Sequence, residues 1–182
     1  MGDSFIAACV SVRELNPGSE PIPKDAPWTG AGKSKYSEVE NKMSSRLSKV
    51  LSFLLGVQMF MFGFLKFFQP FHGWFEIQIQ QSHLPHEAIL AGKLTEMLTG
   101  VLFLLPWLRR SLTARCKDQI LLIACSILFT QMVVAIYVHL QPGVPASVLP
   151  LGIKTPVIPC VVLLLGLLTA FDIWKRLRAE KA

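Results

Sequence analysis

The chain has 182 residues, of which 52% are hydrophobic and only 16% are charged, and its formal net charge is +6. This length allows one soluble domain, or several membrane spans with short loops, but not both. The basic residues lie at the ends of long apolar segments instead of forming a patch on a soluble fold, which argues against nucleic-acid binding. The alternation of uncharged and charged segments is typical of a chain that crosses a lipid bilayer several times.

Residues 1–45 are predicted to form a disordered cytoplasmic tail. The stretch is polar and shows no helical or strand periodicity, and prolines and glycines recur between Pro17 and Gly32. Such a composition cannot bury enough apolar surface to order the chain. The short apolar patch near the start follows Asp3 and no basic cluster, so it does not resemble a signal peptide.

Four apolar segments follow, each close to the roughly 20 residues that cross a hydrocarbon core of about 30 Å. The predicted spans cover residues 47–68, 88–107, 119–140 and 156–174. Short loops between them favour an up-down arrangement. The expected fold of residues 46–175 is therefore an all-α, four-transmembrane-helix up-down bundle, followed by a short basic cytoplasmic tail at 176–182.

The distribution of lysine and arginine predicts the orientation of the bundle. The loop at residues 69–87 contains neither, whereas basic residues cluster before the first span, between the second and third, and after the fourth. Loops rich in lysine and arginine stay in the cytoplasm. Both ends of the chain are therefore expected on the cytoplasmic side. The residues of the three clusters are Lys42, Arg46, Lys49, Arg109, Arg110, Arg115, Lys117, Lys175, Arg176, Arg178 and Lys181.

The second span carries a carboxylate on a stripe of small residues. Gly92, Glu96 and Gly100 recur every four residues and so share one helix face, while Gly63 and Lys66 lie near the end of the first span. Small residues let membrane helices approach closely. The stripe, and Glu96 with it, is predicted to face the interior of the bundle.

Glu96 is expected about 12 Å below the outer surface, at 1.5 Å per residue. A charge at that depth is costly and needs a partner. Lys66 is the first candidate, because side chains lean towards the N-terminus of their own helix and the two helices run antiparallel. Lys93, three residues before Glu96, could pair with it instead. Two interpretations stay open: a structural ion pair, or a site that handles a ligand or a proton.

All four histidines, His72, His83, His86 and His139, fall on the predicted outer side. Their spacing is compatible with a metal or a haem ligand, although interfacial solvation is the simpler interpretation. No CxxC pair indicates a redox motif or a zinc knuckle.

Other polar residues in the spans have structural interpretations. Gln131 is predicted to form a hydrogen bond between helices. Asp172 is predicted to pair with Lys175 or Arg176. No nucleophile–base pair or phosphate-binding loop occurs, so no autonomous catalytic activity is expected.

The order Gly63-Phe-Leu-Lys66 in the first span, then Glu96-Met-Leu-Thr-Gly100 in the second, resembles the DoxX-like family of small four-helix membrane proteins. The resemblance covers about residues 47–174, and the long tail, Lys93 and a proline-rich third loop depart from it. It implies an accessory or membrane-anchor component of a quinone-linked or redox-stress complex in a bacterial cytoplasmic membrane. Quinone is then the candidate cofactor, and a protein partner or a homo-oligomer is expected.

Two alternatives remain. More distant relatives of the family act as chaperones, which implies a client-binding membrane protein. A small-solute transporter is the least favoured, because the chain has no internal repeat and no pair of broken helices.

Overall fold

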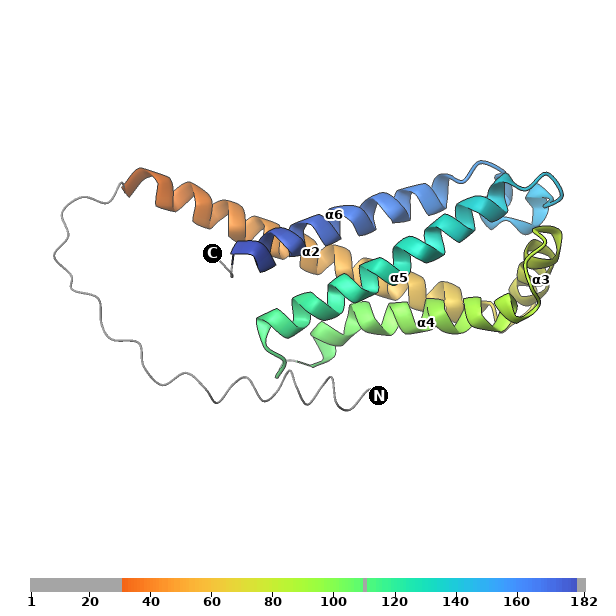
Figure 1. Ribbon diagram of the computed structural model, residues 1–182, viewed down its shortest axis with the longest axis horizontal. Helices are drawn as coiled ribbons and strands as arrows, with labels where there is room; N and C mark the ends of the chain where they lie inside the picture. Colours follow the sequence, from red (N-terminus) through yellow and green to blue (C-terminus); the bar gives the residue numbers. More distant parts are fainter. Residues whose placement is uncertain (1–30, 110, 180–182) are drawn as a thin grey trace.

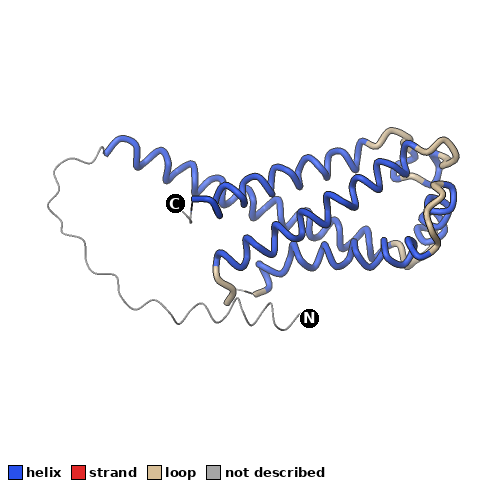
Figure 2. The backbone as a smooth tube through the Cα atoms, in the orientation of Figure 1, coloured by secondary structure: helices blue, strands red, loops and turns tan. Residues whose placement is uncertain are grey.

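The computed structural model describes residues 31–109 and 111–179, with side chains from Leu47 onward. In this part the chain is entirely helical, without strands, as Figure 2 shows. The elements are α2 (Ala31–Leu65), α3 (Phe71–Gln81), α4 (Glu87–Leu108), α5 (Ala114–Leu140), the 3₁₀ turns η2 (Ala146–Val148) and η3 (Pro150–Gly152), and α6 (Val157–Ala179). The expected all-α fold is confirmed.

Four of these helices are long and apolar enough to cross a membrane. The spanning segments are Leu47–Leu65 in α2, then the whole of α4, α5 and α6. Each lies within a few residues of its predicted position. The chain is therefore a multi-pass integral membrane protein.

The four long helices form a closed bundle in which neighbours in the chain are neighbours in space. α2 packs on α4, α4 on α5, α5 on α6, and α6 returns to α2. The start of α2 and the end of α6 lie at one end, here called the terminal end (Figure 1). α3 and the 3₁₀ turns lie at the opposite end, here called the α3 end. The central core consists of Leu55, Met59, Phe103, Leu121, Ala124, Cys125, Leu128, Met132, Val162 and Ile173.

Local sequence explains where several helices begin. The Thr113 side chain accepts a hydrogen bond from the Cys116 amide at 3.3 Å and so caps α5. Pro156 precedes α6 and Pro159 lies in its first turn, where a missing amide donor costs little.

The first and last helices extend beyond the predicted spans. α2 begins at Ala31, so the helix includes residues 31–45 of the predicted tail. Beyond Gly32 this stretch has no proline or glycine, and it continues directly into the apolar span. The rest of the predicted tail, residues 1–30, lies outside the described residues. At the other end α6 continues to Ala179, into the predicted basic tail.

The loop predicted at residues 69–87 contains the 11-residue helix α3. Phe71, Phe75 and Ile79 recur every four residues, which gives the segment an apolar stripe. Phe75 and Ile79 are buried against Ile89 of α4. α3 lies across the end of the bundle (Figure 1), and this burial stabilises a helix too short to form alone.

Candidate functional site

The seam between α2 and α4 is made of glycines at the places where the two backbones meet. A Cβ on Gly63 would lie 2.8 Å from the backbone nitrogen of Met97, and one on Gly100 would lie 2.5 Å from that of Phe60. Real Cβ atoms do not approach so closely, so neither position accepts a larger residue without movement of a helix. The predicted close approach is confirmed for Gly63 and Gly100.

Lys66 and Glu96 face each other across this seam. The Lys66 Nζ donates a hydrogen bond to Glu96 Oε1 and forms an ion pair with it. Their side chains are 19% and 16% exposed. The lean of side chains on antiparallel helices brings the two together as expected. The Lys66 Nζ also lies 4.0 Å from the centroid of the Phe75 ring, so α3 contacts the pair as well.

The second carboxylate oxygen of Glu96, Oε2, is buried and has no hydrogen-bond partner among the described residues. Buried polar atoms are nearly always paired, and an unpaired charged acceptor costs free energy. Only one of the two carboxylate oxygens of Glu96 therefore has a hydrogen-bond partner among the described residues. Its free oxygen can accept a hydrogen bond from a group that the chain itself does not supply.

Lys93 pairs with His72 of α3 and does not take the alternative partner, Glu96. Its Nζ lies 2.8 Å from His72 Nδ1, and the Lys93 residue is buried. His72 Nε2 in turn lies 3.5 Å from Glu76 Oε1. If the lysine donates to Nδ1, the ring proton is on Nε2 and faces the glutamate. Lys93, His72 and Glu76 thus form a second polar chain, which ties α4 to α3.

Gly92 packs against a different helix from Gly100. A Cβ at Gly92 would lie 2.9 Å from Cζ of Phe75, so this glycine makes room for α3 and not for α2. Of the predicted glycine stripe on α4, Gly100 contacts α2 and Gly92 contacts α3. The glycine stripe therefore lets both α2 and α3 pack closely on α4 near Glu96.

The remaining histidines do not join this cluster. His83 has a positive φ of 56° in the turn after α3, and His86 precedes α4; both are exposed. His139 is buried, and its Nδ1 lies 2.9 Å from the carbonyl oxygen of Ala135 on its own helix. Within residues 31–109 and 111–179, no three His, Cys, Asp or Glu residues gather closely enough to hold a metal ion. The geometry gives the metal interpretation no support.

A second charged cluster lies at the terminal end of the bundle. Arg176 donates to Asp118 of α5 at 2.9 and 3.3 Å, to Asp172 of its own helix at 2.6 Å, and to Ser48 of α2 at 2.7 Å. The pairing with Asp172 confirms a prediction. The contacts with Asp118 and Ser48 were not predicted, because they join residues far apart in the sequence.

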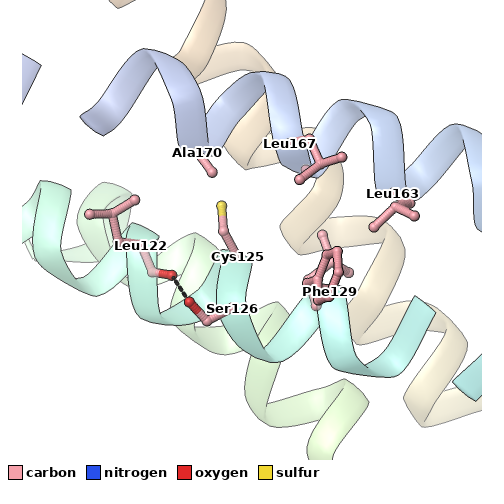
Figure 3. A pocket seen from close by; sticks show the side chains of 9 residues that line it. Leu122, Cys125, Ser126, Phe129, Leu163, Leu167 and Ala170 are labelled. Atoms are coloured by element: carbon pink, nitrogen blue, oxygen red, sulfur yellow. Dashed lines mark hydrogen bonds between the residues drawn. The ribbon is translucent and has the colours of Figure 1, made fainter. Parts of the chain in front are cut away.

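A hollow lies away from both clusters, between α5 and α6 (Figure 3). It measures about 270 Å³ and is lined by apolar side chains around Cys125, Ser126 and Gly166. The Ser126 hydroxyl already donates to the Leu122 carbonyl. The groove offers no charged group to a ligand, so the α3 end is the better candidate site.

Part of this site was open to sequence reasoning and part was missed. Phe75 escaped notice because the segment of α3 was taken for a loop, although its apolar period was a usable signal. Comparisons of the chain with family models, with curated proteins and with solved structures found no match. The site is therefore interpreted from its own geometry.

Proposed function

We propose that the protein is a DoxX-like accessory or membrane-anchor component of a quinone-linked or redox-stress complex in a bacterial cytoplasmic membrane. The sequence resemblance at Gly63, Lys66, Glu96 and Gly100 supports this family, and the structure brings these four positions to one seam. The α3 end would then face away from the cytoplasm.

The distribution of charge supports this orientation. Among the described residues, the basic side chains of the terminal end outnumber those of the α3 end, as the positive-inside rule requires for a cytoplasmic terminal end. Those at the terminal end are Lys49, Arg109, Arg115, Lys117, Lys175, Arg176 and Arg178, and those at the α3 end are Lys66, Lys93 and Lys154.

The ligand proposed for the α3 end is a quinone headgroup. A quinone carbonyl accepts hydrogen bonds and a quinol hydroxyl donates one. The buried, unpaired Oε2 of Glu96 is an acceptor for such a hydroxyl, and this oxygen is the observation that carries the proposal. Lys93, one turn away on the same helix, holds an ammonium group beside His72 that could donate to a carbonyl.

A client-binding role is the second candidate, because the α3 end also exposes aromatic side chains. Phe67 and Phe68 follow α2, while Phe71 and Trp74 lie on α3, and each is between 39% and 52% exposed. Aromatic rings at this level are common membrane-interface anchors. They would equally suit an apolar segment of another protein.

Native purification followed by mass spectrometry of bound lipids and proteins tests the proposal. The wild-type protein should carry quinone, and Glu96→Gln should lose it while it keeps the same elution profile. Glu87→Gln is the matched control, because Glu87 is an exposed acid in the first turn of the same helix. Its quinone content should equal that of the wild type.

The outcomes separate the candidate functions. Wild-type protein without quinone, or equal quinone in Glu96→Gln, would overturn the ligand proposal. Recovery of an oxidoreductase with the protein would support the accessory role. Recovery of membrane polypeptides whose abundance falls when the gene is deleted, with unchanged respiration, would favour client binding. If Glu96→Gln fails to fold, the ion pair is structural.

A further inference from the structure

α2 continues well past the membrane-spanning part of the bundle. The apolar window starts at Leu47, but the helix starts at Ala31. The residues between them extend the helix by about 24 Å at 1.5 Å per residue. Figure 1 shows this extension, in orange, projecting beyond the ends of the other described helices.

The apolar residues of the extension follow a heptad pattern. Between Lys33 and Arg46 they are Tyr36, Val39 and Met43, with spacings of three and four. These are the a, d and a positions of the repeat abcdefg that is typical of coiled coils. Glu38, Asn41 and Ser45 occupy c and f positions. The sequence therefore places three apolar residues at successive a and d positions of the extension, and polar residues at the c and f positions named.

The same register continues into the membrane on the side that faces away from the bundle. The next a, d and a positions are Val50, Phe53 and Val57, which are 52%, 44% and 38% exposed; of these, the Phe53 ring also packs edge-on against Trp107 of α4. The c and f positions of this part include Ser48, Ser52 and Leu55, which are 4%, 1% and 1% exposed and face the bundle. One stripe thus runs along the outside of α2, from the extension into the apolar span.

We propose that this stripe binds α2 of a second copy of the chain, so that the two extensions form a parallel two-stranded coiled coil. Every copy has the same orientation in the membrane, so two α2 helices lying side by side must run parallel. In a parallel pair, residue g of one helix lies beside residue e of the next heptad on the other. Lys35 and Glu40 occupy these positions, and their opposite charges attract.

The seam is not uniform along its length. The d position at the junction with the membrane is Arg46, a polar residue that weakens the seam at that level. The contact is therefore expected to be strongest at Val39 and Met43 in the extension. This dimer does not involve Lys66 or Glu96, so it can be tested separately from the proposed quinone site.

Cross-linking of single cysteines in native membranes tests the proposal. In the full-length chain, with Cys9, Cys116, Cys125 and Cys160 replaced by alanine, Met43→Cys should give a disulfide-linked dimer on mild oxidation. Ser45→Cys and Asn41→Cys, at c and f on the same helix, are the matched controls and should remain monomeric. Val39→Cys, a second seam position, should behave like Met43→Cys.

Two results would overturn the dimer. One is equal cross-linking at Met43, Ser45 and Asn41, which indicates random collision. The other is a Met43→Cys variant that does not react with a maleimide reagent and also forms no disulfide-linked dimer. That result indicates that another part of the chain, another protein or lipid covers the stripe. Val39→Glu gives an independent check. In the native-cysteine background it should abolish the dimer measured by light scattering in detergent, while the thermal midpoint of the bundle stays unchanged.

Discussion

Arg176 at the terminal end and Glu96 at the α3 end are both charged groups between packed helices, yet their surroundings differ. Arg176 is bound by two carboxylates and a hydroxyl from α2, α5 and α6. Glu96 is bound by Lys66 through one oxygen, and its other oxygen is buried without a partner in the described chain.

This difference indicates different roles for the two ends. A charge cluster whose groups are paired within the chain holds helices in register and needs nothing more. An unpaired buried acceptor lowers the free energy of unfolding, and a bound group that donates a hydrogen bond to it removes this penalty. Both ends bury an ion pair, and the unpaired oxygen of Glu96 is what differs between them.

The largest effect is expected from Lys66→Met, which leaves the buried Glu96 carboxyl group without its cation. We expect the free energy of unfolding, measured by SDS titration in mixed micelles, to fall by about 3 kcal/mol. The double variant Lys66→Met/Glu96→Gln removes the stranded charge and should recover more than half of this loss. A double variant no more stable than Lys66→Met would contradict the buried pair.

A smaller loss is expected from Arg176→Gln, which removes the shared cation of Asp118 and Asp172. These side chains are partly exposed, so water screens the acids that remain, and we expect a loss of about 2 kcal/mol. Lys175→Gln, at the exposed neighbouring position, should change stability by less than about 0.5 kcal/mol. Equal effects of the two changes would show that Arg176 acts only through its net charge.

Gly63→Ala tests whether the close packing of α2 and α4 at the glycines sets the distance between Lys66 and Glu96. The new methyl group would meet the backbone of Met97, so α2 and α4 must separate, at a cost of about 1–2 kcal/mol. Gly73→Ala is the control, because its nearest contact is the Gln69 side chain at 3.4 Å. The control should be as stable as the wild type or slightly more stable, since alanine favours a helix.

The smallest effect is expected from Gln131→Leu, between the two ends. Gln131 donates to the Thr99 hydroxyl at 3.1 Å, but its own side-chain oxygen is buried and finds no partner among the described residues. The change removes one hydrogen bond and one unsatisfied acceptor together, so we expect a loss below about 1 kcal/mol. A loss larger than that of Arg176→Gln would mean that the middle of the bundle, and not its ends, holds the helices in register.

Sequence reasoning succeeded where a local rule determines the geometry. The four spans follow from their length and apolarity. The Lys66–Glu96 contact follows from the lean of side chains on antiparallel neighbours, and the Asp172–Arg176 contact from a spacing of four residues. Gln131 was correctly expected to bond across helices, although its partner, Thr99, could not be named.

The failures required knowledge of tertiary packing. Lys93 could be paired with His72 only once α3 was known to lie over α4. α3 itself depends on the burial of its apolar stripe and not on local propensity. Asp118 lies 58 residues from Arg176 in the sequence, and no spacing rule connects them.

The membrane-spanning parts of the four helices differ in length, and this affects how the bundle fits the bilayer. α5 has 27 residues, about 40 Å at 1.5 Å per residue, whereas the apolar window of α2 has 19 residues, about 28 Å. A bilayer interior of about 30 Å matches α2 but not an upright α5. α5 must therefore incline or extend past the hydrocarbon interior, and its first turns, which carry Arg115, Lys117 and Asp118, are suited to lie in the polar interface.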